Sequence, residues 1–135
     1  MRKLAGLTAV TTLAAALLLA PVAGAKDGRG DRGGKDGVRV AGTCSAASTA
    51  KLKLSGEDAG IEVELEVDQN RNGVRWSVVL VRNGVQVAKR VRVTRAPSGS
   101  FDARFVTGNR AGVDRFVARA TSPSGERCVA RASIG

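Results

Sequence analysis

The stretch D-Q-N-R-N-G at residues 68–73 carries oxygen-bearing side chains at alternate positions, as a calcium-binding loop does. A loop of the EF-hand type has oxygen ligands at its first, third and fifth positions, glycine at the sixth and a bidentate glutamate at the twelfth. Asp68, Asn70 and Asn72 match the early positions, but the twelfth is Val79, which offers no side-chain oxygen. We therefore predict a turn here, and a calcium site on Asp68, Asn70 and Asn72 is kept as a further hypothesis.

Catalytic combinations of side chains are missing from the sequence. The chain has no histidine, which removes Ser-His and Cys-His nucleophile systems and the usual zinc ligands. The glutamates of Glu62–Glu66 alternate with apolar residues, which places them in a row on one open strand face rather than across a cleft. We expect them to pair across strands with Lys51, Lys53 or Arg104. The sequence predicts no enzymatic activity and no cofactor.

Alternation with a period of two indicates that these residues lie on β-strands. Apolar and acidic residues alternate from Ile61 to Asp68, which is typical of a half-buried strand, and no window has helical spacing. The expected strands are 50–54, 61–68, 74–80, 85–93, 101–106, 114–121 and 127–134, with 38–43 as an additional one. We predict an all-β fold, a single antiparallel, immunoglobulin-like sandwich of about seven to eight short strands in one domain, residues 38–135.

Two Asn-Gly pairs are expected to reverse the chain, because Asn and Gly accept the positive φ angles of sharp turns. In an immunoglobulin-like arrangement the loop at 68–73 crosses between the two sheets. The tight hairpin then falls at the second pair, Asn83 and Gly84. The single tryptophan, Trp76, is expected to be buried on the strand that follows the crossing loop.

Two cysteines, Cys44 and Cys128, stand near the two ends of the predicted domain. An even pair in a small secreted domain is most simply a disulfide, and two free thiols or a metal pair are the alternative. A bridge requires the two Cα atoms to lie within about 7 Å of each other, so the first and last strands must be neighbours. Closing so long a loop would stabilise the fold by about 4–5 kcal/mol in the chain-entropy model.

Residues 1–25 have the features of a secretory signal peptide. Two basic residues precede an apolar run at 4–20, and residues 23–25 have the small-x-small form that signal peptidase accepts. A retained N-terminal anchor is the alternative. Residues 26–37 contain only Lys, Arg, Asp and Gly, which predicts a flexible tether. We therefore expect a secreted, extracellular protein with no integral membrane segment once the signal is removed.

Four stretches carry a resemblance to a known group: K-L-K-L, D-Q-N-R-N-G-V-R-W, P-S-G-S-F and A-R-A-T-S-P-S-G-E-R-C. Through them the region from Cys44 to Cys128 resembles small secreted proteins of high-GC Gram-positive bacteria with immunoglobulin-like or fibronectin type III-like sandwiches. The chain departs from the immunoglobulin pattern in having no tyrosine and in placing Cys44 before the second main strand. The resemblance implies the fold and brings no activity with it.

The chain is strongly basic, with 22 Lys and Arg against 12 Asp and Glu and a formal net charge of +10. If Trp76, Phe116 and Cys128 point inward, alternation turns arginines outward on four strands of one sheet, while Glu62–Glu66 falls on the opposite sheet. No aromatic residue is expected among them, which disfavours stacking with sugars or bases. The expected outward arginines are Arg75, Arg90, Arg92, Arg115, Arg119, Arg127 and Arg131.

Guanidinium groups bind phosphate, sulfate or carboxylate through paired hydrogen bonds. The leading hypothesis is therefore a secreted, non-enzymatic module that binds anionic envelope or extracellular polymers, without specific nucleic-acid recognition. One alternative is a structural or protein-interaction domain that uses the valines between these arginines. Another is a calcium-dependent module. A basic surface that does no more than keep the protein soluble would explain the same composition.

Overall fold

The computed structural model describes residues 37–57 and 60–135, and in these ranges the chain forms nine strands and no helix. The predicted signal peptide and, except for Gly37, the predicted tether lie outside the described residues. The strands are β1 (Val38–Ala41), β2 (Thr43–Cys44), β3 (Thr49–Glu57), β4 (Gly60–Asp68), β5 (Arg75–Arg82), β6 (Val85–Val93), β7 (Ser100–Gly108), β8 (Asp114–Thr121) and β9 (Arg127–Ile134).

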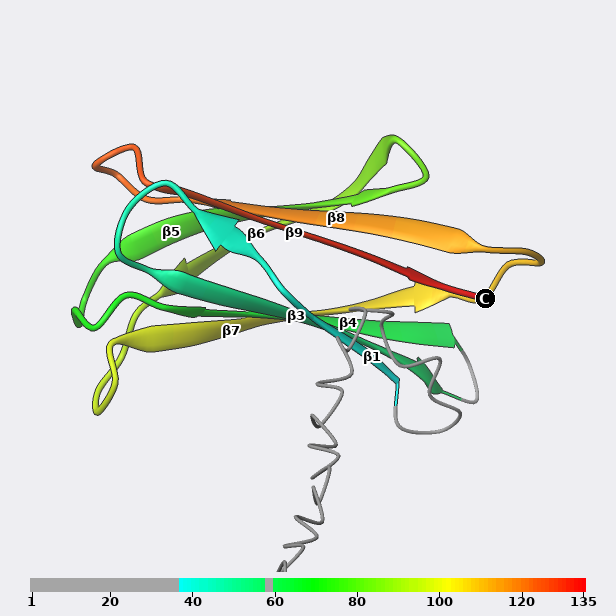
Figure 1. Cartoon of the computed structure of the whole chain (residues 1–135), viewed down its shortest axis with the longest axis horizontal. Helices are drawn as coiled ribbons and strands as arrows, with labels where there is room; N and C mark the ends of the chain where they lie inside the picture. The colour runs from blue at the N-terminus through cyan, green and yellow to red at the C-terminus, as the bar shows by residue number, and fades with distance from the viewer. Residues whose placement is uncertain (1–36, 58–59) are drawn as a thin grey trace, which may run out of the picture.

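The strands form two antiparallel sheets that pack face to face, which confirms the predicted all-β sandwich (Figure 1). One sheet has four strands in the order β1-β3-β4-β7, and the other has five in the order β2-β9-β8-β5-β6. The four strands expected to share a sheet do so, and the acidic strand β4 lies in the other one. The expected segment 38–43 divides into two strands, because β1 pairs with β3 whereas β2 pairs with β9.

The core fills the space between the two sheets, and its side chains come from every second position of the strands, where they point inward. Trp76 is fully buried, as expected, and its ring centroid lies 5.9 Å from that of Phe101. The indole Nε1–H donates to the Gln69 side-chain oxygen at 3.0 Å. This bond satisfies a donor that would be costly to bury without a partner. The other large, fully buried side chains are Phe116, Leu52, Leu54, Leu65, Leu80, Val63, Val67, Val78, Thr94 and Cys128.

The predicted disulfide between Cys44 and Cys128 is confirmed. The early strand that it joins to the last strand β9 is β2, the second one, because β1 belongs to the other sheet. The two residues lie directly opposite each other in the β2–β9 ladder, with their Cα atoms 4.0 Å apart. The bridge spans 84 residues of sequence, so it fastens β2, near the beginning of the described domain, to the last strand. Cys128 is fully buried, so this bridge is also part of the core.

Both Asn-Gly pairs reverse the chain as expected. Asn83 and Gly84 have φ angles of 49° and 82° and stand between the paired residues Arg82 and Val85, which makes β5 and β6 a tight hairpin. The loop at 68–73 connects β4 in one sheet to β5 in the other. The sequence therefore predicted which of the two turns crosses between sheets.

Candidate anion-binding face

The outer surface of the five-stranded sheet carries exposed basic side chains. Strict alternation on β8 and β9 buries Phe116 and Cys128 and turns the arginines of both strands to solvent. Among the described residues, no acidic side chain of this sheet points to the same side, because Asp114 is buried on the inward phase. We call this surface, which carries Arg75, Lys89, Arg115, Arg119, Arg127 and Arg131, the arginine face.

The register of β8 against β9 arranges four of these arginines in a zigzag. Arg119 lies opposite Val129 and Arg131 lies opposite Val117, so each arginine has its basic neighbours diagonally across the ladder. The order along the strands is Arg127, Arg119, Arg131 and Arg115. Each step advances two residues, or about 7 Å, and the whole row covers about 20 Å.

A shallow groove lies at one end of the arginine face, beside the β5–β6 hairpin. Val79, Val81 and Val117 line its apolar floor, and Arg115 and Arg119 stand beside them. Val79, Val81 and Val117 are half-buried although they lie on the outer side of the sheet. The long aliphatic stems of arginine side chains commonly cover such apolar surface while the charged ends remain in water.

Two of the predicted arginines are not on this face, and this part of the prediction was wrong. Arg90 lies opposite Val78 and Arg92 lies opposite Trp76, so both point to the inner side of the sheet. Arg90 lies over the Phe105 ring, with its Cζ 5.4 Å from the centroid. Arg92 donates from Nε to the Asp102 carbonyl oxygen at 3.2 Å. Both side chains therefore bridge from β6 to β7 along the flank of the sandwich.

A one-residue irregularity in the β5–β6 ladder explains the error. Leu80 pairs with Ala88 but Val81 pairs with Gln86, so Val87 is an extra residue in β6. A shift of one residue sends every later side chain of the strand to the opposite face. With an uninterrupted ladder, Arg90 and Arg92 would have joined the arginine face, as predicted.

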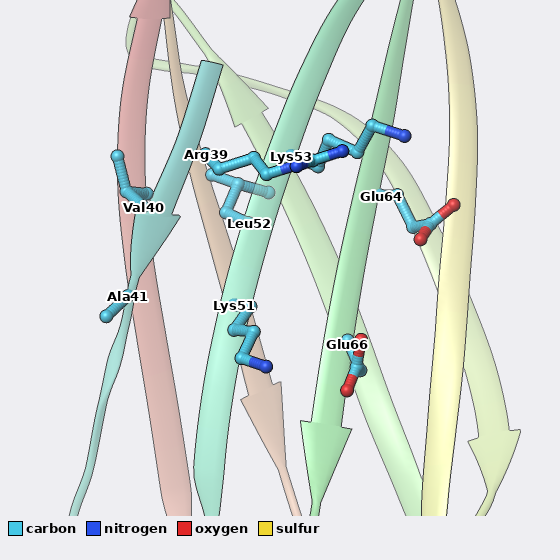
Figure 2. A pocket seen from close by; sticks show the side chains of 8 residues that line it. All are labelled: Arg39, Val40, Ala41, Lys51, Leu52, Lys53, Glu64 and Glu66. Atoms are coloured by element: carbon cyan, nitrogen blue, oxygen red, sulfur yellow. The ribbon is translucent and has the colours of Figure 1, made fainter. Parts of the chain in front are cut away.

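The outer surface of the four-stranded sheet differs in that its basic residues stand beside acidic ones (Figure 2). Lys51 lies opposite Glu66, and Lys53 lies opposite Glu64. Arg104 pairs with Glu64 at 2.9 Å and also with a second glutamate of the same row at 3.3 Å. The hydrogen bond to Glu64 is the main reason why the pKa of Arg104 is raised. The predicted cross-strand partner Arg104 is thus confirmed, and the charges of this surface largely offset one another.

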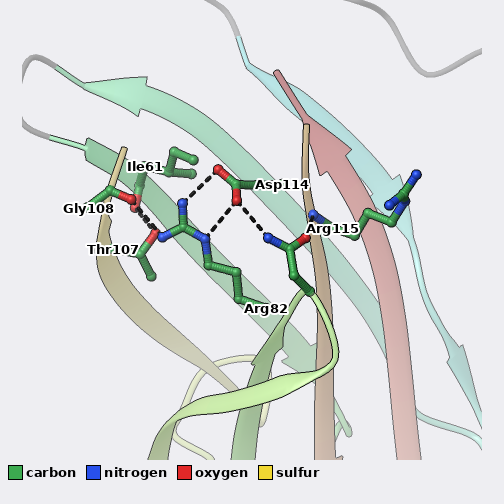
Figure 3. A network of polar contacts seen from close by, with 7 residues as sticks. Ile61, Arg82, Thr107, Gly108, Asp114 and Arg115 are labelled. Carbon is green, nitrogen blue, oxygen red and sulfur yellow. Dashed lines mark hydrogen bonds and ion pairs between the residues drawn. The ribbon is translucent and has the colours of Figure 1, made fainter. Parts of the chain in front are cut away.

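A buried ion pair, which the sequence reasoning missed, supports one end of the arginine face (Figure 3). Arg82 donates from Nε and Nη2 to the two carboxylate oxygens of Asp114, at 2.9 and 2.6 Å, and from Nη1 to the Gly108 carbonyl oxygen at 2.6 Å. The hydrogen bonds from Arg82 hold the pKa of the Asp114 carboxyl below its ordinary value. The guanidinium also lies 5.5 Å from the centroid of the Phe116 ring.

Asn83 extends this network to the surface. Its amide donates to Asp114 Oδ1 at 3.0 Å, and its side-chain oxygen accepts from the backbone N–H of Arg115 at 2.9 Å. The backbone N–H of Asn83 donates to the Arg115 carbonyl at 2.8 Å. The hairpin that ends β5 is therefore tied to the strand that carries Arg115, which fixes the last position of the zigzag.

The loop at 68–73 has the hydrogen bonds of a turn. The Asp68 carboxylate accepts the backbone N–H of Asn70 at 3.0 Å, and Asn70 has a φ of 57°. Thr94 holds the far side of the loop by donating from its hydroxyl to the Arg71 carbonyl at 2.5 Å. Among the described residues, no group of three or more His, Cys, Asp or Glu side chains gathers as a metal site would. The structure has the turn that we predict, and the weaker hypothesis of a calcium site on Asp68, Asn70 and Asn72 stays untested.

Comparison with known proteins assigns no function to this chain, so a function has to be inferred from the residues described above. No protein-family model matches the chain, and no curated protein matches it. The part of the chain that the structure describes contains no helix of the length and hydropathy needed to span a membrane. The structure defines an all-β sandwich with one basic and one charge-paired outer surface.

Proposed function

We propose that this protein is a secreted, non-enzymatic module that binds linear anionic polymers of the cell envelope or the extracellular space through its arginine face. The observation that carries the proposal is the zigzag of Arg127, Arg119, Arg131 and Arg115 along β8 and β9. Within the described residues, none of these four side chains forms an ion pair with a carboxylate. Their guanidinium groups are therefore available to an external anion.

A linear polyanion fits this arrangement better than a small anion does. The arginines advance by about 7 Å along a straight line, rather than converging on one point, so successive anionic groups of an extended chain can each meet a guanidinium. Arginine binds phosphate, sulfate and carboxylate through two parallel hydrogen bonds. The valines between the arginines leave few polar groups that compete for the same anions.

Recognition on this face would depend on charge rather than on stacking. The chain has one Trp, three Phe and no Tyr, and all four aromatic side chains are buried. Base-stacking and sugar-stacking platforms need exposed rings, so neither mode is available to this chain. Binding of this kind is screened by salt, and it selects for charge density more than for polymer sequence.

The disulfide supports the extracellular part of the proposal. Disulfides persist in oxidising compartments and are rare in the reducing cytosol. The bridge between Cys44 and Cys128 is consistent with such a compartment. The apolar run and small-x-small site at residues 4–25 supply the route by which the chain would be secreted.

Capture on purified envelope from the producing cell tests this function. Wild-type protein should bind at low salt and elute at moderate salt, and the triple variant Arg115→Ser, Arg119→Ser, Arg131→Ser should lose most of the capture. The matched control removes the same charge from the other sheet, with Arg39→Ser, Lys51→Ser and Lys53→Ser, and should still bind. Equal loss in the two triple variants would show that net charge matters and the arginine face does not.

A further inference from the structure

Strand β6 forms an exposed edge of the five-stranded sheet. Among the described residues it has one neighbour in that sheet, β5. The strand is nine residues long and contains no proline. Of the six large apolar side chains that are strongly exposed in the described ranges, four lie on it: Val85, Val87, Val91 and Val93, at 64%, 41%, 42% and 37%. A long edge strand with unpaired backbone groups and exposed apolar side chains is a template for pairing with another strand.

The ladder between β5 and β6 determines which backbone groups of β6 face outward. The Thr94 N–H donates to the Val74 carbonyl at 2.9 Å, just beyond the end of β6. Antiparallel ladders alternate, so Arg92 and Arg90 direct their N–H and C=O groups to β5. The backbone groups of Lys89, Val91 and Val93 therefore point away from the sheet. Arg92 Nη1 reaches the Val91 carbonyl at 3.0 Å, as expected for a carbonyl on the open side.

A groove runs beside this edge, between β6 and the connection that leads to β7. Its lining includes Val91 and Val93 from β6, Arg95 from the connection, and Phe101 and Asp102 from β7. The two phases of β6 present different chemistry along it. Val91 and Val93 lie on the outer side of the sheet. Arg90 and Arg92 lie on the inner side, where Arg92 also contributes to the groove.

We propose that β6 accepts, by strand addition, an extended segment of another protein in which acidic residues alternate with apolar ones. Strand addition uses backbone hydrogen bonds for affinity and alternate side chains for selectivity. Acidic side chains of the added strand would lie next to Arg90 and Arg92 on the inner side. Its apolar side chains would lie next to Val91 and Val93 on the outer side. The site uses the open edge of β6 and none of the four arginines of the zigzag, so it does not rest on the function proposed above.

Charge disfavours a second copy of this chain as the occupant. Two β6 strands paired antiparallel about Val91 would place Arg90 of each copy opposite Arg92 of the other. Like charges directly opposite each other on a ladder are destabilising. The segment at residues 26–37 is also unsuited, because it contains only Lys, Arg, Asp and Gly and has no apolar side chain to alternate. An acidic, apolar strand from another protein satisfies both phases of β6.

A designed peptide tests the proposal directly. The probe is the acetylated, amidated peptide Glu-Val-Glu-Thr-Glu-Val-Glu with a fluorophore, and its control has the same composition with all glutamates in one block. Wild-type protein should bind the alternating peptide at least tenfold more tightly than the block peptide, as measured by fluorescence anisotropy at fixed salt. Equal binding of the two peptides would overturn the proposal, because charge alone would then account for the interaction.

The variant Val91→Pro removes one outward N–H without removing any bond to β5, since proline is tolerated on an edge strand when its missing N–H faces solvent. It should lose binding at least tenfold, whereas Val91→Thr, which keeps the N–H, should bind the peptide like wild type. The triple variant Arg115→Ser, Arg119→Ser, Arg131→Ser should also bind the peptide like wild type, which separates this site from the arginine face. Full binding by folded Val91→Pro would contradict strand addition.

Amide hydrogen exchange of the wild-type protein gives a second measurement, which does not depend on whether a variant folds. Addition of the alternating peptide should slow exchange at Lys89, Val91 and Val93 and leave Arg90 and Arg92 almost unchanged. The alternation is the signature of a new ladder, because side-chain binding alone would not select every second amide. Uniform protection of β6, or none, would overturn the proposal.

Discussion

Arg82 and Asp114 form a bidentate ion pair in the interior of the sandwich, with both side chains only 3% exposed. The pair lies at the end of β5 and the beginning of β8, and it ties the β5–β6 hairpin to the strand that carries Arg115 and Arg119. The geometry at this end of the arginine face therefore depends on an ion pair that is buried behind the surface.

Replacing Arg82 with Met should destabilise the fold strongly. The substitution leaves the Asp114 carboxylate buried without its cation, and breaking one side of a buried pair costs roughly 3–5 kcal/mol. The free energy of unfolding from urea titration measures the effect. Arg104→Met is the matched control, because its ion pairs are at the surface, where such pairs contribute little. Similar losses of unfolding free energy in Arg82→Met and Arg104→Met would contradict a stabilising role for the buried pair.

Asp114 should make stability depend on pH. A carboxyl whose folded-state pKa is lowered stabilises the fold fully above its ordinary value of about 4, and this contribution is lost as pH falls toward the folded-state pKa. Asp114→Asn should be less stable than wild type at neutral pH, and it lacks this titrating carboxyl. The difference in unfolding free energy between wild type and variant should therefore narrow below about pH 4. A difference that is constant with pH would show that Asp114 is not responsible.

The disulfide should supply a large part of the domain's stability. It closes a loop of 84 residues, for which the chain-entropy model gives about 4–5 kcal/mol. Replacing both Cys44 and Cys128 with Ala should lower the unfolding free energy by at least that amount, since Cys128 is also a buried core residue. A loss under about 1 kcal/mol would show that the double variant holds β2 against β9 without the bridge.

Calcium should leave the protein unchanged. Asp68 is the single carboxylate of the loop at 68–73, it already accepts the backbone N–H of Asn70, and Arg71 lies within the same loop. The melting temperature should be the same in millimolar calcium and in chelator. A rise with calcium that Asp68→Asn abolishes would restore the calcium hypothesis, because a ligand that binds the folded state alone raises its stability.

The sequence predicted the strands well because most of them bury one face and alternate strictly. The buried rings of Trp76 and Phe116 show which alternate residues of their strands point inward. The five arginines expected to point outward on β5, β8 and β9 do so, and four of them form the zigzag. The same rule failed on β6. There the phase depends on Val87, whose extra position in the ladder is a property of the pairing with β5 and has no marker in the sequence.

The same reasoning from alternation could have predicted the buried ion pair between Arg82 and Asp114. Arg82 continues the inward phase of Trp76, Val78 and Leu80, and Asp114 precedes Phe116 on the inward phase of its own strand. Two opposite charges on inward phases predict a buried pair if their strands are neighbours. Arg82 lies beyond the expected end of its strand at residue 80 and next to the Asn-Gly turn, however, where a polar residue is typical of a turn.

Titration of long-chain polyphosphate into the protein at several salt concentrations tests the central claim most directly. Wild-type affinity should fall steeply with salt, because each neutralised anionic group releases a counterion. The triple variant Arg115→Ser, Arg119→Ser, Arg131→Ser should bind at least tenfold more weakly and with a shallower salt dependence. The variant Arg39→Ser, Lys51→Ser, Lys53→Ser should match wild type in both respects. If the two variants lose the same affinity and the same slope, the arginine face is not the binding surface.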